Sequence, residues 1–196
     1  MTFNFDNDII LESSSLLLRP IGMADVENLL GIATADKSLV QFSPKQIYSA
    51  ELLTVYIRNA MAYRTNKTGY SFSIYSKTDQ CYVGSTSFLN IATDDDRLEI
   101  GATWIGRQFQ GTGLNRQCKY LLLQYAFNVC QAHRVAFVTD ERNLQSRRAI
   151  EKIGGVFEGV FREQIVMYDG FRRNTYCYSI LQQEWEAMKA NFLTMK

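Results

Sequence analysis

Residues 108–113, Gln-Phe-Gln-Gly-Thr-Gly, join a strand-like segment to a long helical pattern, and this junction restricts the fold more than any other segment. The strand pattern covers residues 97–105, and the helical pattern runs from residue 113 to about 131. Gly111 and Gly113 allow the backbone to approach a ligand without an intervening Cβ atom. The N–H groups of a helix N-terminus point at such a ligand, and the helix dipole favours an anion. The junction therefore predicts a pyrophosphate-binding loop.

A short glycine motif also has two other interpretations. It can be a strand-to-helix turn that only needs flexible residues. It can also be the G-x-G-x-x-G loop of a dinucleotide-binding Rossmann domain, with Gly111 and Gly113 in the first two positions. The third position then falls on Arg116, which is too large for close helix–strand packing, although Asp140 ends a later strand where a ribose-binding acid would stand. The order of the other elements decides against the Rossmann fold.

Hydrophobic periodicity and turn residues predict those other elements. Strands are expected at residues 16–20, 70–75, 81–91, 97–105, 134–139, 156–167 and 171–180. Helices are expected at residues 24–35, 50–65, 113–131, 143–153 and 182–192. Ser49 is a predicted N-cap, Gly84 a predicted bulge, and Asp169-Gly170 a predicted hairpin turn.

A Rossmann domain needs repeated right-handed βαβ units, whereas this order contains one parallel crossover, around the helix that follows Gly111. The predicted fold class is therefore α/β (α+β), with a mixed, mostly antiparallel central sheet and helices on both faces. A length of 196 residues fits one domain over residues 1–196. Apolar residues make up 46% of the chain, which is enough to bury a sizeable core.

Composition excludes several classes of function. The net charge of +1 gives no bulk attraction toward nucleic acid or a membrane surface. There is no apolar run of about 18 residues, and residues 1–8 lack the pattern of a secretory signal, so a cytoplasmic protein is expected. The four cysteines are scattered and His133 is the only histidine, so neither a metal site nor a Ser-His-Asp triad is favoured. His133 fits a helix C-terminus, where the dipole favours it.

Two motifs in order carry a resemblance to a known family. The Q-x-x-G-x-G spacing of Gln108, Gly111 and Gly113 resembles the acetyl-CoA loop of the GNAT acetyltransferases. Residues 143–154 are similar to the N-x-x-S-x-x-A-x-x-x-x-G stretch of the ribosomal-protein N-acetyltransferase (RimJ/RimL-like) branch, through Asn143 and Ser146. Residues 158–170 also look like this branch, and the resemblance covers about residues 14–188.

The resemblance implies a GNAT fold with acetyl-CoA as co-substrate. Its diphosphate is expected on backbone donors of residues 111–114, and its pantetheine arm along the strand edge of residues 103–105. The expected cofactor-binding residues are Trp104, Ile105, Gln110, Gly111, Thr112, Gly113, Leu114, Asn115, Asn143 and Ser146. Arg107, Arg116 and Arg147 are candidate phosphate ligands or solvated surface residues. Asn143 is alternatively only an N-cap, and Ser146 only a first-turn residue.

Acetyl transfer needs a neutral amine, a polarised thioester carbonyl and a protonated leaving thiol. Glu99 is the candidate base, because strict alternation would put it with Gly101 and Thr103 on the strand face that leads to the loop. The other face would carry Leu98, Ile100, Ala102 and Trp104. Ser146 is a candidate acid, and the backbone N–H of Ile105 or a neighbour a candidate carbonyl donor. The family often uses a tyrosine as the acid, but none follows Gly154 before Tyr168.

The sequence thus predicts an acetyl-CoA-dependent N-acetyltransferase, with direct attack of the amine in a ternary complex. The acceptor is a protein N-terminal α-amine or a small-molecule amine, and the alternatives are a non-catalytic acyl-CoA-binding or sensor protein and a dinucleotide-binding protein. Aromatic residues near turns are candidates to line the acceptor pocket: Phe42, Tyr48, Tyr168 and Phe171. A homodimer is expected through the weakly charged strand around Tyr176, Tyr178 and Ile180, unless the helix containing Trp185 covers it.

Overall fold

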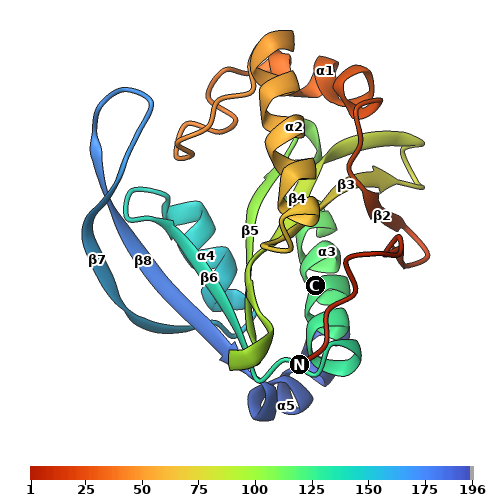
Figure 1. Cartoon of the computed structure of the whole chain (residues 1–196), viewed down its shortest axis with the longest axis vertical. Coiled ribbons are helices and arrows are strands. Elements are labelled where there is room, and N and C mark those ends of the chain that lie inside the picture. Colours follow the sequence, from red (N-terminus) through yellow and green to blue (C-terminus); the bar gives the residue numbers. More distant parts are fainter. Residues whose placement is uncertain (195–196) are drawn as a thin grey trace.

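Eight strands form one sheet in the order β1-β2-β3-β4-β5-β6-β8-β7 in the computed structural model, which describes residues 1–194 (Figure 1). The strands are β1 (Leu11–Glu12), β2 (Leu16–Pro20), β3 (Tyr70–Ser76), β4 (Cys81–Ala92), β5 (Arg97–Ile105), β6 (Arg134–Asp140), β7 (Val156–Val166) and β8 (Arg172–Leu181). Every pair in this sheet is antiparallel except β5–β6. The predicted mixed, mostly antiparallel sheet with one parallel crossover is therefore confirmed.

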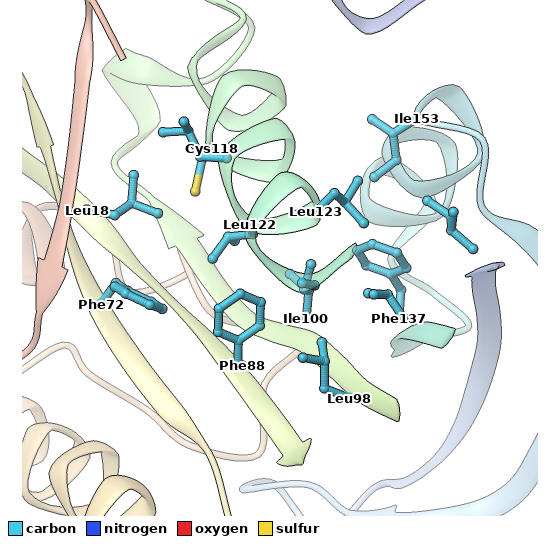
Figure 2. Packing of buried hydrophobic residues seen from close by; sticks show 14 of the residues in the cluster. Leu18, Phe72, Phe88, Leu98, Ile100, Cys118, Leu122, Leu123, Phe137 and Ile153 are labelled. Atoms are coloured by element: carbon cyan, nitrogen blue, oxygen red, sulfur yellow. The ribbon is translucent and has the colours of Figure 1, made fainter. Parts of the chain in front are cut away.

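Helices cover both faces of the sheet and divide the buried residues into two clusters. The helices are α1 (Asp25–Ala35), α2 (Ala50–Thr65), α3 (Leu114–Gln124), α4 (Leu144–Lys152) and α5 (Gln182–Thr194). On one face α3, α4 and α5 bury residues such as Cys118, Ile150 and Trp185 against the strands. Figure 2 shows Leu122 and Leu123 of α3 over the side chains of the sheet. On the other face α1 and α2 enclose a smaller cluster that includes Leu29 and Ile57.

Local sequence signals account for most of the element boundaries. The Ser49 hydroxyl accepts the N–H of Leu52 at 3.2 Å and caps α2, as predicted. The β3–β4 register shifts beside Gly84, where a bulge was predicted, and Gly170 closes the β7–β8 turn at a φ of 82°. Strand β1 was not predicted. The expected helix over residues 113–131 is α3 followed by a π-helical turn, Tyr125–Val129, so the α-helical pattern ends earlier than the apolar pattern.

Strands β5 and β6 pair for only three residues and then diverge. Their register is Arg97 with Arg134, Leu98 with Val135 and Glu99 with Ala136. Beyond these pairs the strands separate toward the C-terminal end of β5, as their ribbons show in Figure 1. We call the opening between residues 100–105 of β5 and residues 137–140 of β6 the strand fork. The glycine loop, residues 108–113, follows β5, and α4 follows β6. The loop and the motif of residues 143–154 therefore both begin at the fork.

The strict alternation expected along β5 is wrong beyond Ala102. This residue has a φ of 48°, and the β4–β5 register shifts opposite it, between Ser85 and Ser87. A bulge inserts one residue and therefore exchanges the faces of everything after it. Trp104 consequently packs with α1 and α2, whereas Thr103 turns to α3.

The strand proposed for self-association is not at the sheet edge. Strand β8 pairs with β6 on one side and β7 on the other, and Tyr178 and Ile180 are buried in the same cluster as Trp185 of α5. The expectation that β8 leaves an open surface is therefore wrong. The open edge belongs to β7, which is solvent-exposed along most of its length and carries exposed apolar residues.

Candidate functional site

The glycine loop has the backbone conformation that its sequence predicts. Gly111 and Gly113 have φ angles of 77° and 88°, which residues other than glycine rarely adopt. A Cβ atom at Gly111 would meet no protein atom within 4 Å, so the space outside the loop is open to a ligand. Gly113 is the N-cap of α3 and supplies no capping side chain. The first N–H groups of the helix are thus left for an anion.

Some side chains of the loop hold it to the rest of the fold, and others are exposed to solvent. The Gln110 amide donates to the carbonyl oxygen of Ile105 at 2.9 Å and holds the loop to the end of β5. Leu114 is buried and anchors α3, whereas Thr112 and Asn115 are exposed. The predicted cofactor residues of this segment therefore lie together, with Gln110 and Leu114 supporting the loop.

The second motif lies next to the first. The Asn143 side chain accepts the N–H of Ser146 at 3.0 Å and caps α4, which is the simpler of the two roles expected for it. The hydroxyl of Ser146 is half-buried beside this cap. Gln145 lies within 3.4 Å of Gln110, so the N-terminus of α4 reaches the glycine loop. The fold brings both predicted motifs to the strand fork.

The three candidate arginines are in different positions. Arg107 forms an ion pair with Asp36 at 2.6 Å. Arg147 donates to the carbonyl oxygen of Glu141 and stacks on an aromatic ring of β8 at 4.0 Å. Arg116 places its guanidinium 3.9 Å from the position of a Cβ atom at Gly113, beside the loop. Among the three, Arg116 is the one whose guanidinium group lies at the start of α3, beside Gly113.

Glu99 lies where the β5–β6 pairing ends, and its residue is 9% exposed. Its carboxylate accepts a hydrogen bond from the Asn90 amide at 2.9 Å. Burial raises the pKa of Glu99, and the Asn90 bond and the charges of Arg173 and Lys119 lower it by less. A carboxylate with a raised pKa at the edge of a fork is a suitable proton acceptor.

Two buried cations near Glu99 were not predicted. Lys119 of α3 is 8% exposed, and Arg173 of β8 is 6% exposed. Burial lowers the pKa of Lys119 to about 8, against the raising effects of Cys118 and Glu99. The sequence did contain a signal for Lys119. On a helix Lys119 is a neighbour of Leu122 and Leu123, three and four residues on, and so falls on the apolar side, where a lysine is usually avoided.

Aromatic residues from distant segments meet around Arg142. Its guanidinium lies 3.7 Å from the ring centre of Phe171 and 5.7 Å from that of Phe42, and so links the β7–β8 turn to the loop between α1 and α2. Tyr48 and Tyr168 are exposed in the same two segments. Asp140 pairs with Arg142 at 2.7 Å, which does not fit the ribose-binding role considered for Asp140.

His133 stands apart from this site. It is exposed and immediately precedes β6, whereas the glycine loop follows β5. Because β5 and β6 are parallel, these positions are at opposite ends of the strands. No cluster of His, Cys, Asp or Glu within the described part of the chain could hold a metal ion. In the same residues, no helix combines the length and apolar character needed to cross a membrane.

Comparisons with known proteins found similar sequences and folds. Residues 15–156 match the family model described as acetyltransferase (GNAT) domain. The chain is 32% identical to a Bacillus subtilis protein named "Putative ribosomal N-acetyltransferase YdaF", over 57% of this chain and 60% of that protein, which is less than two thirds of its length. It is 26% identical to the uncharacterized N-acetyltransferase YoaA of Bacillus subtilis, over 88% of this chain and 97% of that protein.

A solved structure shows the same fold. The GCN5-related N-acetyltransferase from Brucella melitensis superposes with a TM-score of 0.89, over 97% of this chain and 86% of that chain. The two sequences are 22% identical, so this likeness concerns the fold.

Proposed function

The chain belongs to the acetyltransferase (GNAT) family. We propose that it transfers the acetyl group of acetyl-CoA to a primary amine by direct attack in a ternary complex. Acetyl-CoA is the co-substrate of this family, and N-acetyltransferase is the activity after which the relatives are named. The proposed acceptor is a protein N-terminal α-amine or a small-molecule amine. The name of YdaF supports the first of these.

One observation carries the proposal: two glycines with positive φ form an uncapped helix N-terminus at the mouth of the strand fork. The N–H groups of Gly111 to Leu114 would hold the diphosphate, with Arg116 beside them. The pantetheine amides would pair with the free edge of β5 between Thr103 and Ile105, as an added strand does. Asn143 and Ser146 would contact the arm from the α4 side.

The reacting groups follow from this placement. In the proposal, Glu99 accepts the proton of the acceptor ammonium, directly or through one water molecule. The bulge at Ala102 interrupts the β4–β5 ladder, and a backbone N–H in residues 102–105 polarises the thioester carbonyl. Phe42 and Phe171, held around Arg142, would form the rim through which the acceptor enters. With its four cysteines all free, the protein is proposed to work in the cytoplasm.

Calorimetric titration with acetyl-CoA tests the cofactor site. The native protein should bind, and Gly111→Val should bind at least tenfold more weakly, because its side chain would occupy the diphosphate position. Gly170→Val is a matched control, since Gly170 has a similar φ of 82° and equally open surroundings in the β7–β8 turn. Equal affinities for the native protein and Gly111→Val would show that the site is misplaced.

Turnover distinguishes an enzyme from a non-catalytic acyl-CoA-binding protein. Release of CoA from acetyl-CoA should depend on an added amine, tested with peptides that carry free N-termini and with small amines, including polyamines. Peptide-dependent release would support the protein acceptor. Binding without release for every amine would support the non-catalytic alternative, and binding of NADH in place of acetyl-CoA would support a dinucleotide-binding protein.

A further inference from the structure

The ammonium group of Lys119 occupies the strand fork from the α3 side. Its Nζ atom donates to the hydroxyl of Thr103 on β5 at 2.8 Å and lies 5.8 Å from the ring centre of Phe137 on β6. Thr103 is the residue after the Ala102 bulge, and Phe137 is the first residue of β6 beyond the last β5–β6 pair. The ammonium group thus sits in the gap where the two strands part.

Structural needs do not explain a cation at this position. A buried ammonium group costs free energy unless it is paired and hydrogen-bonded. Within the described residues, Thr103 accepts one of the three N–H groups of Lys119, and no carboxylate lies within ion-pair distance. Glu99 and Cys118 are the titratable groups whose charges act on it. A methionine would fill the same space without this cost, so packing alone does not require a charge at this position.

We propose that Lys119 is the acid that protonates the sulfur of CoA as the thioester breaks. The inference rests on the proposed function, which places the pantetheine arm in the strand fork. Lys119 lies six residues beyond Gly113, so a co-substrate bound at the start of α3 would extend along the fork toward its Nζ atom.

The protons balance with Lys119 in this role. The acceptor ammonium gives one proton to Glu99 and becomes a nucleophilic amine. Its nitrogen forms the C–N bond at the acetyl carbon, and the C–S bond then breaks with its electron pair on sulfur. Lys119 gives a proton to that sulfur, and the second proton of the acylated nitrogen restores the ammonium group of Lys119. The net release is one proton, from Glu99 to solvent.

The pKa of Lys119 is similar to the pKa of a thiol. Burial lowers the pKa of Lys119 to about 8, close to the ordinary pKa of a thiol, which is about 8.5. Proton transfer between groups of similar pKa is efficient in both directions. The hydroxyl of Thr103 can orient the ammonium group but cannot replace it, because a neutral hydroxyl is a much weaker acid.

Binding of CoA itself tests the inference without knowledge of the acceptor. The ultraviolet absorbance of the thiolate is measured as the difference between the complexes with CoA and with dethio-CoA. The range from about pH 6 to about pH 10 covers the pKa values of the thiol and of Lys119. The subtraction removes the absorbance of the protein. An ammonium group within about 6 Å should lower the pKa of the bound thiol by about one unit or more. Lys119→Met should abolish this shift, and Lys152→Met, an exposed lysine of α4, should retain it.

A conservative variant separates charge from proton donation. Lys119→Arg keeps a positive charge but holds its protons at every pH used. In this variant the pKa of the bound thiol should therefore remain lowered. Its kcat should fall at least tenfold with an amine that the native enzyme accepts. The same variant tests the inference if Lys119→Met does not fold. Full activity of Lys119→Arg would contradict proton donation.

The remaining outcomes are also decisive. An unshifted thiol in a native complex that binds CoA would overturn the role of Lys119 and leave the proposed function standing. Loss of CoA affinity in Lys119→Met would assign the lysine to binding and overturn its role as an acid. Failure of the native protein to bind CoA would overturn the proposed function and this inference together.

Discussion

Glu99 combines burial with a position at the end of the β5–β6 pairing, and its raised pKa has a measurable consequence. A general base is active when deprotonated, so kcat should rise with pH through the raised pKa of Glu99. Glu99→Gln should remove this rise and lower kcat by about 10²–10⁴-fold, with acetyl-CoA affinity unchanged. Steady-state kinetics across pH and calorimetry check both parts.

Glu186→Gln, an exposed carboxylate of α5, is the control and should behave as the native enzyme does. A Glu99→Gln enzyme with a native pH profile and near-native kcat would exclude the carboxylate from the reaction.

Lys119 should make stability depend on pH in a direction set by burial. Its pKa is about 8 in the folded protein and 10.5 ordinarily, so between these values the unfolded chain binds more protons. Stability contributed by this residue therefore rises as pH increases from about 8 to about 10.5. Urea unfolding of the native protein and Lys119→Met should show a difference in unfolding free energy that moves in favour of the native protein over this range. A difference that stays constant with pH would show that Lys119 titrates normally.

Some residues of the site could be predicted from sequence because their structure is local. The positive φ of Gly111 and the N-cap at Asn143 depend on a few neighbouring residues. The surroundings of Glu99 and Lys119 depend on strands and helices that are distant in sequence. Strict alternation put Glu99 on one face with Thr103, but the bulge at Ala102 moves Thr103 to the face of α3. The alternating pattern also gave no sign of the cations near Glu99.

Strand β5 shapes the strand fork, and its bulge carries strain. Ala102 is a non-glycine residue with a φ of 48°, and a left-handed conformation costs about 1–2 kcal/mol. Ala102→Val should lower the free energy of unfolding by about 1 kcal/mol or more beyond the effect of Ala92→Val, because a β-branched side chain fits a positive φ less well than alanine does. Ala92 lies in extended backbone at a φ of −123°. Urea unfolding measures both. Equal losses would show that the bulge is not strained.

The order of elements could be predicted, whereas the details of pairing could not. Caps, glycine turns and apolar periodicity act within a few residues, and they gave the helices α1, α2 and α4 and the β7–β8 turn. The bulge at Ala102 and the fork depend on the register between β4, β5 and β6, which periodicity does not contain. The position of β8 inside the sheet was missed for the same reason. The strand order β6-β8-β7 leaves β7 at the edge, and a sequence pattern does not show the strand order.

The exposed edge strand β7 is the expected site of a homodimer. It carries exposed apolar side chains, among them Phe161, which is 57% exposed. Uncovered strand edges and apolar surfaces favour association. Light scattering at micromolar concentrations should give the mass of a dimer, and Phe161→Asp should give a monomer. Val129→Asp is the control, because Val129 is 61% exposed in the π-helical turn. A monomer mass for the native protein would contradict the prediction.

The strand fork divides the sheet into two parts, β1–β5 and β6–β8, that share three residue pairs. A co-substrate in the fork touches both parts, so its binding energy adds to the free energy of unfolding. At a ligand concentration of 100 times Kd the gain is about 2.7 kcal/mol. For a chain of this size we expect Tm to rise by roughly 5–10 °C in scanning calorimetry. Gly111→Val should lose this rise, and Gly170→Val should retain it.

Loaded and empty enzyme molecules would then differ in lifetime as well as in activity. A protease that cleaves the opened chain acts on the empty form first, because that form opens more often. The amount of enzyme in a cell would therefore follow the supply of CoA and acetyl-CoA, because either ligand in the strand fork stabilises the folded chain.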